Sequence, residues 1–337
     1  MVKIFIFLSV LLIVFFVLNV SLGSVSIPLD DIIYILLGNT EIKESWQTII
    51  LNFRLPKALM AIMVGSGLAI SGLLMQTLFR NPLAGPFVLG ISSGASLGVA
   101  LLILGTTIFG GSLLALSFSN WALPIAASLG SFLVLSAVII AANKVRNTMS
   151  ILIIGLMFGS LTAAVISVLS YFSEASKIQQ FVFWSFGSLS NLSWQELQIF
   201  TILYLVGIFS CFSIIKPLNS FLLGENYAKS LGINIKKSRN LILLITSILT
   251  GVITAFCGPI AFIGLAIPHI ARMLFSTSNH KILLPASAII GAIVLLICDS
   301  IAQLPMSEFT LPINAVTSIF GAPIVIWLLI RKRKIFV

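Results

Sequence analysis

The chain has 337 residues, of which 59% are apolar and only 8% are charged. Soluble globular proteins carry about 25% charged residues, so this composition and a mean hydropathy of +1.17 exclude an ordinary soluble domain. The formal net charge is +10, but the cations occupy short segments between apolar runs and form no basic face with interleaved aromatic residues. This distribution argues against a nucleic-acid partner and is typical of a protein embedded in membrane lipid.

Apolar runs of about 20 residues, the length that crosses a bilayer, recur along the whole chain. A membrane β-barrel would instead alternate apolar and polar residues. The sequence therefore predicts an all-α, multi-pass membrane protein with about ten transmembrane helices. The predicted spans are 4–22, 57–78, 87–108, 121–142, 149–170, 194–215, 240–257, 259–275, 282–302 and 311–330.

The distribution of Lys and Arg tests this count of spans. With the N-terminus in the cytoplasm, 15 of the 19 cations fall on the cytoplasmic side, as the positive-inside bias requires. Lys43, Arg54, Lys57 and Lys177 fall outside. We therefore predict a single transmembrane domain, residues 1–337, with both termini cytoplasmic. The first apolar run is long and has no convincing cleavage site, so an uncleaved span is favoured over a signal peptide.

Two segments on the predicted outer side are longer than simple connections. Residues 23–53 are predicted to form a loop with a short interfacial helix. Residues 171–193 carry several aromatic side chains, which are typical of an interfacial anchor, with the wall of a pore mouth as the alternative. Asp299, near the outer end of the ninth span, is costly at that depth unless it is wet or paired.

The longest inner loop, residues 216–239, is polar. We expect Pro217 to end the sixth span, Glu225 to Leu231 to form a short amphipathic helix, and Gly232 to stop that helix in the left-handed conformation. A plain connection needs only a few residues. The loop is therefore a candidate docking surface for a cytosolic partner, and a helix that lies among the lipid headgroups is the alternative.

The seventh and eighth spans meet at a break in the helical pattern. Gly258 and Pro259 force a turn, and Pro268 interrupts the hydrogen bonding of the short eighth span. A broken membrane helix must find partners within the protein. This segment is therefore predicted to be buried.

The sequence contains no motif for catalysis or for a resident metal. The three cysteines lie in apolar runs without C-x-x-C spacing, and His269 and His280 are not at ligand spacing from each other. No G-x-x-x-x-G-K-[ST] loop is present to bind a nucleotide. The chain is therefore predicted to be non-catalytic and to have no cofactor of its own, so uphill transport must draw its energy from a partner.

The stretch from residue 54 to 98 reads RLPKALMAIMVGSGLAISGLLMQTLFRNPLAGPFVLGISSGASLG. It strongly resembles the permease subunits of binding-protein-dependent ABC importers for iron chelates and cobalamin, the FecCD-type or type II importer family. The resemblance continues in LGINIKKSR, GPIAFIGLAIPHIAR and LPINAVTSIFGAPIVIWLL. It covers nearly the whole chain in the right order and spacing.

The resemblance implies the ten-span permease fold of type II ABC importers, in the bacterial cytoplasmic membrane. It implies a second permease subunit (a homodimer or a similar heteromer), two cytosolic ATPase subunits that use ATP and Mg²⁺, and an extracellular substrate-binding protein. Arg54 and Lys57 match basic positions that meet glutamates of the binding protein. The residues that match the family's ATPase-coupling helices are Leu223, Gly224, Glu225, Ala228, Leu231 and Gly232. The residues expected to line the cargo path are Met75, Gln76, Gly155 and Gly159.

Two positions depart from the family pattern. Gln303 stands where a third basic residue is common, and Asn314 stands where glycine is frequent. Both bear on docking of the binding protein, and they fit a heteromeric partner that supplies the missing charge. The favoured function is import of a ferric siderophore by alternating access, with haem or cobalamin as other cargoes. A proton- or sodium-coupled carrier would need buried ionisable groups or unwound ion sites, and these are nearly absent, with Asp299 the one candidate in the sequence. An intramembrane enzyme would need clustered catalytic residues, and the sequence shows none.

Overall fold

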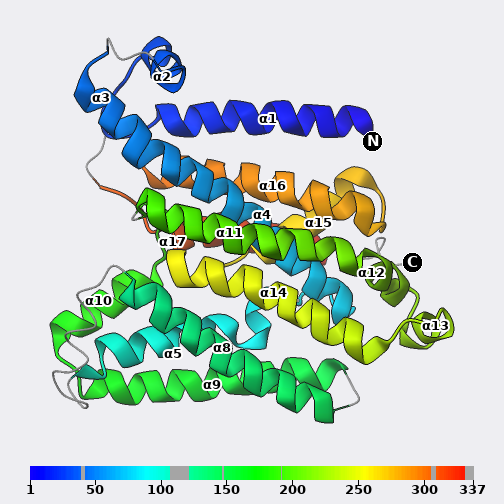
Figure 1. Ribbon diagram of the computed structural model, residues 1–337. Coiled ribbons are helices and arrows are strands. Elements are labelled where there is room, and N and C mark those ends of the chain that lie inside the picture. Colours follow the sequence, from blue (N-terminus) through cyan, green and yellow to red (C-terminus); the bar gives the residue numbers. More distant parts are fainter. Residues whose placement is uncertain (39–41, 107–120, 146–147, 191, 305–308, 331–337) are drawn as a thin grey trace. The chain divides into compact units, whose positions relative to one another are not determined.

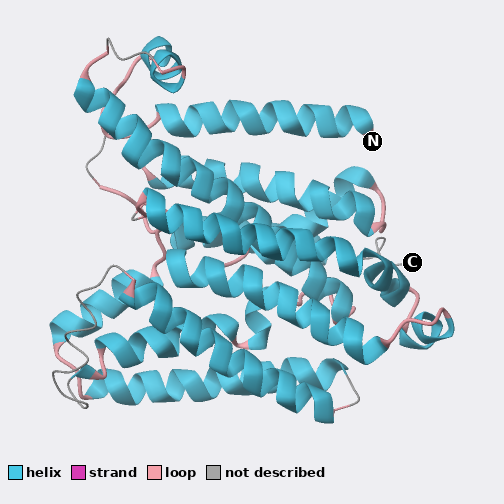
Figure 2. Cartoon of the chain, in the orientation of Figure 1, coloured by secondary structure: helices cyan, strands magenta, loops and turns pink. Residues whose placement is uncertain are grey.

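A computed structural model of the chain describes residues 1–38, 42–106, 121–145, 148–190, 192–304 and 309–330 (Figure 1). Within these ranges every regular element is helical (Figure 2). Arg146 and the basic residues 331–334, which belong to the 15 cations predicted to be cytoplasmic, lie outside the described residues. The elements are α1 (Val2–Ser21), α2 (Leu29–Leu36), α3 (Glu44–Thr48), η1 (Ile49–Arg54), α4 (Leu55–Leu78), η2 (Pro86–Leu89), α5 (Ile91–Ile103), α8 (Ala122–Lys144), α9 (Thr148–Tyr171), α10 (Ala175–Ser185), α11 (Trp194–Cys211), η3 (Phe212–Ile214), α12 (Ile215–Leu222), α13 (Glu225–Ser230), α14 (Ile235–Cys257), α15 (Ile263–Phe275), α16 (His280–Ala302) and α17 (Ile313–Ile330).

The predicted spans all correspond to apolar helices. Among the described residues, seven helices are long and apolar enough to cross a membrane. Three shorter apolar helices, Ile91–Ile103, Ile263–Phe275 and Ile313–Trp327, occupy the third, eighth and tenth predicted spans. The all-helical, multi-span fold class predicted from composition is therefore confirmed.

Several predicted boundaries were wrong, and proline explains two of them. The loop predicted up to residue 53 instead becomes helical at Glu44 and runs into α4 through the π-helical turn η1. Pro56 has no backbone N–H to donate, and the π-helical turn just before it lets the helix continue without that hydrogen bond. Pro217 does not end a helix but lies in the first turn of α12, where proline is tolerated.

The start of α14 was also predicted too late. The helix begins at Ile235 rather than at residue 240, so Lys236, Lys237 and Arg239 lie within its first two turns. The reason is a side-chain cap, since the Asn234 side-chain Oδ1 accepts a hydrogen bond from the Lys237 backbone N–H at 3.0 Å.

The chain divides into two compact units. The first contains Met1–Ile70, Ser188–Ile202 and Ile260–Val337, and the second contains Ser71–Gly187 and Leu203–Pro259. Helices α4 and α11 contribute residues to both units. The single domain over 1–337 stays a prediction.

The first unit is built on close contacts of α16. Helix α1 lies along α16, and α15, α16 and α17 pack against one another (Figure 1). Two glycines bring α4 and α16 together, because a Cβ atom on Gly65 would lie 2.3 Å from the carbonyl oxygen of Gly291. Small residues at such crossings allow the van der Waals packing on which membrane helix association depends.

The second unit centres on α5, which packs against α8 and α9, while α14 packs against α8. Small residues on one face of α5 form a helix contact. A Cβ atom on Gly94 would lie 2.6 Å from the carbonyl oxygen of Gly130, and one on Gly98 would lie 2.0 Å from that of Ala126. Gly90 has another role, because it takes φ +74° at the junction of η2 and α5.

The predicted break between the seventh and eighth spans is present. Helix α14 stops at Cys257, and Gly258 takes φ +71° directly after it. Phe262, with φ +67°, precedes α15, and Pro268 lies inside that helix. The freed backbone finds a partner in the first unit, where the Ala261 N–H donates to the side-chain oxygen of Asn314 at 3.0 Å. A glycine at position 314 could not accept this bond, which gives that departure a physical reason.

Candidate functional site

A buried carboxylate organises the first candidate site. We call it the Asp299 cluster; it consists of Asn19, Lys57, Asp299 and Gln303. Asp299 in α16 is 2% exposed, and its Oδ1 lies 3.1 Å from Nζ of Lys57 in the first turn of α4. Its Oδ2 accepts hydrogen bonds from the side-chain amides of Asn19 in α1 at 2.9 Å and of Gln303 at 2.8 Å. Three helices of the first unit therefore meet at one carboxylate.

The charges of this cluster are balanced. Moving a charge out of water costs several kcal/mol per ion unless an opposite charge and hydrogen bonds compensate. The side chains of Lys57 and Asp299 are 15% and 3% exposed, so the pair is shielded in a way that a surface salt bridge is not. Asp299 was predicted to be either wet or paired, and the structure shows that it is paired.

Arg54 is buried for a different reason. Its guanidinium donates to the carbonyl oxygens of Val20 at 3.0 Å, of Ser21 at 2.8 Å and of Val25. The chain wraps closely around it, because a Cβ atom on Gly23 would lie 2.7 Å from Nη2. The last carbonyls of a helix lack intrahelical donors, and the planar fork of arginine satisfies those at the end of α1.

Arg54 and Lys57 were predicted to meet a binding protein, and the structure gives both side chains partners inside the chain. The ion pair was missed because Lys57 and Asp299 lie far apart in sequence. The available signal was a lone carboxylate in one apolar span and a cation at the start of another. The departure at Gln303 also acquires a reason, since a neutral amide completes the cluster without a second cation.

The second candidate site is the α12–α13 segment, residues 215–232, which joins α11 to α14 within the second unit. The predicted amphipathic helix is α13, and Gly232 follows it with φ +78°, as predicted. Gly224 separates α12 from α13 with φ +109°. Glu225, the first residue of α13, forms an ion pair with Arg239 of α14 at 3.3 Å.

The α12–α13 segment exposes large apolar side chains. Leu223, Tyr227 and Leu231 are 64%, 50% and 57% exposed, whereas Ala228 is fully buried. Tyr227 and Leu231 are four residues apart and therefore share one side of α13. Contiguous exposed apolar residues rimmed by polar ones mark an interaction surface. Sequence reasoning omitted Tyr227, although its spacing from Leu231 was visible.

The four residues expected to line a cargo path differ in their surroundings. Met75 and Gln76 in α4 are buried, at 0% and 3% exposure. Gly155 in α9 packs against η2, since a Cβ atom there would lie 2.2 Å from the carbonyl oxygen of Val88. Gly159 is more open, with only the Ser93 hydroxyl within 4 Å of that position. Their part in a path stays a prediction.

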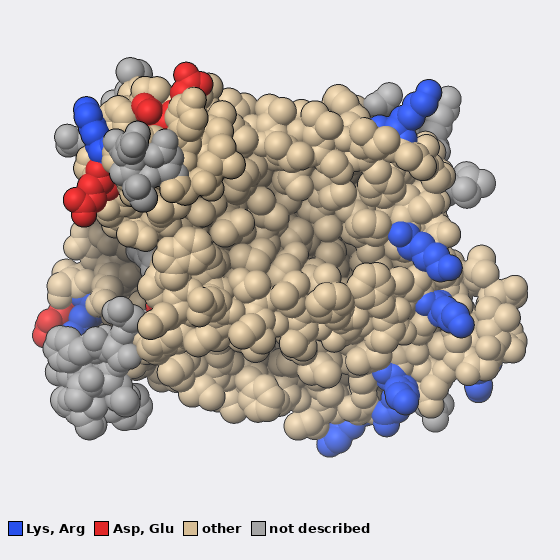
Figure 3. All heavy atoms as spheres, turned by 45° about the horizontal axis from the view of Figure 1, so that its top comes forward, with Lys and Arg blue, Asp and Glu red and all other residues tan. Residues whose placement is uncertain are grey.

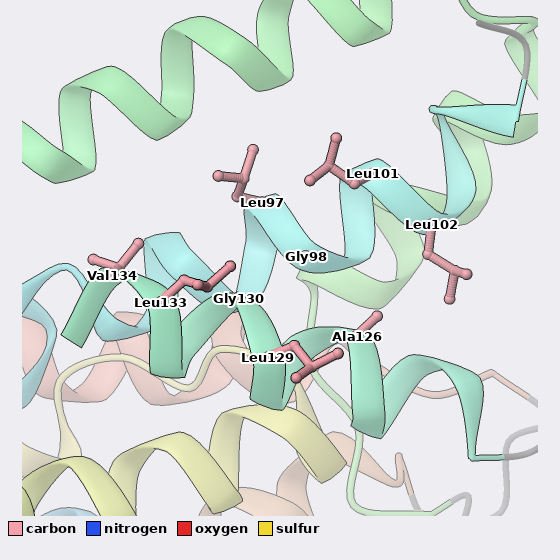
Figure 4. A pocket seen from close by; sticks show the side chains of 9 residues that line it. All are labelled: Leu97, Gly98, Leu101, Leu102, Ala126, Leu129, Gly130, Leu133 and Val134. Atoms are coloured by element: carbon pink, nitrogen blue, oxygen red, sulfur yellow. The ribbon is translucent and has the colours of Figure 1, made fainter. Parts of the chain in front are cut away.

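An apolar groove of about 300 Å³ lies between α5 and α8 (Figure 4). Its lining consists of leucine, valine, alanine and glycine, and the labelled leucines project around it. Sites for polar ligands place a few hydrogen-bonding groups among apolar ones. This groove lacks them, so it is not a candidate for a metal chelate. The lining residues are Leu97, Gly98, Leu101, Leu102, Ala126, Leu129, Gly130, Leu133 and Val134.

Charged side chains are scarce on the face drawn in Figure 3, where small groups of Lys, Arg, Asp and Glu leave wide uncharged areas between them. Within the described residues no three of His, Cys, Asp and Glu come together as a metal site would require. Many exposed large apolar side chains and seven helices of membrane length among the described residues define a polytopic helical membrane protein.

Comparison with known proteins identifies the family. The sequence profile of the FecCD transport family matches residues 11–331. The chain belongs to this family and is the permease component of an ABC importer. Such a multi-span permease is a protein of the bacterial inner membrane.

Curated relatives and a solved structure agree with this assignment. The chain is 39% identical over 288 residues to the vitamin B12 import system permease protein BtuC of Klebsiella pneumoniae, which covers 85% of this chain and 84% of the relative. It is 37% identical over 284 residues to the protein of the same name from Citrobacter koseri. That match covers 84% of this chain and 83% of the relative. A solved inward-facing structure of a candidate metal-chelate type ABC transporter matches with a TM-score of 0.85 and 31% identity, over 98% of this chain and 100% of that one.

Proposed function

We propose that this permease carries cobalamin into the cytoplasm. The observation that supports this cargo is the 37–39% identity to permeases of vitamin B12 import systems over 84–85% of the chain. It favours cobalamin over the ferric siderophore that the sequence alone put first. Cobalamin is itself a metal chelate, so the likeness to a metal-chelate type transporter supports the same class of cargo.

The proposed mechanism is alternating access driven by a partner. Two permease subunits, identical or similar, form the path, and two cytosolic ATPase subunits bind ATP and Mg²⁺ and dock on the α12–α13 segments. The exposed Leu223, Tyr227 and Leu231 support this docking, because aromatic and apolar anchors dominate the energetics of protein interfaces. Both termini and this segment then lie on the cytoplasmic side.

An extracellular binding protein delivers the cargo in this proposal, and Arg54 and Lys57 are its expected docking residues. Lys57 retains 15% side-chain exposure within the Asp299 cluster. Because both cations also contribute to the stability of the fold, any variant tested for docking must also have its melting temperature measured. Lys57→Met combined with Asp299→Asn, which also removes the buried charge that Lys57 balances, should weaken docking, and unchanged docking would remove this assignment.

The test of cargo is uptake by cells with and without this chain. Labelled cobalamin, a labelled ferric siderophore and labelled haem are supplied separately, and accumulation is followed over minutes. We expect only cobalamin accumulation to depend on the chain. If only siderophore accumulation depends on the chain, the siderophore and not cobalamin is the cargo. If accumulation of none of the three probes depends on the chain, import of this class of chelate is contradicted.

A further inference from the structure

The turn after α4 contains a backbone outlier. The Arg80 N–H donates to the carbonyl of Thr77 at 3.2 Å. The Asn81 N–H donates to the carbonyl of Gln76 at 3.1 Å. This pair of bonds is the Schellman motif, in which the residue just past the helix takes a left-handed conformation and is usually glycine. Here that residue is Arg80, with φ +47°.

Helix α13 ends with the same motif and uses glycine. The Gly232 N–H donates to Lys229 at 3.0 Å, and the Ile233 N–H donates to Ala228 at 3.1 Å. Among the described residues, no atom outside the helix and its chain neighbours lies within 4 Å of the position that a Cβ atom on Gly232 would occupy. A left-handed arginine is strained because its Cβ crowds the backbone. Such an outlier points to a task for the side chain.

The contacts of Arg80 indicate that task. Its Nη2 donates to the carbonyl oxygen of Leu222, the last residue of α12, at 3.3 Å. Its guanidinium also lies close to Gly224, where a Cβ atom would be 3.6 Å from Nη1. Gly224 has φ +109° and ψ 153°, a conformation that is essentially restricted to glycine. Arg80 therefore connects the end of α4 to the turn between α12 and α13.

A second cation holds α13 from another direction. Arg239 in α14 lies 3.3 Å from Glu225, and the two side chains are 10% and 43% exposed. Helix α13 is therefore attached to α14 by an ion pair and, through the preceding turn, to α4 by Arg80. Tyr227 and Leu231 remain exposed beside these attachments.

We propose that Arg80 is a positioning residue for transport, which passes a displacement of α13 on to α4. This proposal rests on the proposed function, in which α13 receives an ATPase subunit. Coupling between distant sites requires a contiguous set of contacts, and Arg80 supplies the link between α12–α13 and α4. Glycine would suit the left-handed backbone at this position better than arginine does.

The test uses the complex purified through a tag on this chain, with its associated ATPase, in liposomes. Arg80→Gly removes the guanidinium and relieves the backbone strain. We expect its melting temperature to be unchanged or higher, its ATP hydrolysis to persist, and the labelled cobalamin transported per ATP hydrolysed to fall about tenfold, the size of an ordinary coupling between two sites. Arg80→Lys keeps a cationic donor and should fall in between. Lys236→Ala, which removes an exposed cation at the start of α14, should match the wild type.

Three results would overturn the proposal, and they can be told apart. An Arg80→Gly complex with the wild-type transport ratio shows that the contact transmits nothing. The wild-type protein could instead transport as little cobalamin per ATP as Arg80→Gly does when the lipid is purely zwitterionic, and recover when the lipid is anionic. That result would show that the guanidinium binds a lipid headgroup instead. Wild-type protein that retains no ATPase, or transports no cobalamin, removes the proposed function and this inference with it.

Discussion

The strongest energetic prediction concerns the Lys57–Asp299 pair. Lys57→Met removes the cation that pairs with the carboxylate of Asp299, a residue that is 2% exposed. Breaking a buried pair from one side leaves an uncompensated charge and costs about 3–5 kcal/mol. Asp299→Asn in the same chain removes that charge, so the double variant should be more stable than Lys57→Met alone. A buried pair replaced as a whole often costs little.

Thermal unfolding in detergent measures this cycle with reporters that the chain already has. Cys211, Cys257 and Cys298 are all free and buried, so a thiol-reactive fluorescent dye responds only when the fold opens. We expect Lys57→Met to show the lowest melting temperature, with Asp299→Asn and the double variant between it and the wild type. A Lys57→Met variant as stable as the wild type, or a double variant whose loss equals the sum of the single losses, would refute the reasoning.

Three further outcomes follow from single contacts. Gly98→Ala should cost about 1–3 kcal/mol because its Cβ would lie 2.0 Å from the backbone oxygen of Ala126, whereas Gly251→Ala, with neighbours at 3.8 Å, should be neutral or slightly stabilising in the same melting assay. Arg54→Lys keeps the charge but loses the fork that binds three carbonyls, so it should lower stability by about 2 kcal/mol; a stable variant with weakened binding-protein docking would assign Arg54 to docking instead. Tyr227→Ala should weaken capture of the ATPase about 30-fold at unchanged melting temperature, and full capture would show that α13 docks without this side chain.

The fold was predictable where the physics is local to a segment. Apolar runs located the helix of every predicted span, because this signal accumulates over many residues. The short helix α13 and the left-handed Gly232 were also predicted from local pattern. Boundaries failed where a single residue decides them, as at Pro56, where a π turn extends the helix, and at Asn234, where a side-chain cap starts α14 early.

The candidate sites were predictable only in part, because their contacts join distant segments. The residue types at Lys57 and Asp299 were noted, but no spacing rule relates α4 to α16, so their pairing came from the structure alone. The same holds for Arg80, whose left-handed backbone and contact with Leu222 leave no mark in the sequence. The role expected for Gln303 changed from a missing docking charge to a hydrogen-bond donor in the Asp299 cluster.

The central claim is that this permease moves its cargo only with energy from a partner ATPase. The most direct measurement is uptake of labelled cobalamin by proteoliposomes that contain the complex purified through this chain, with ATP supplied on the side of the ATPase. We predict accumulation that requires hydrolysable ATP and stops when the partner cannot hydrolyse it. Uptake by this chain alone, driven by a proton or sodium gradient without any ATPase, would contradict the account.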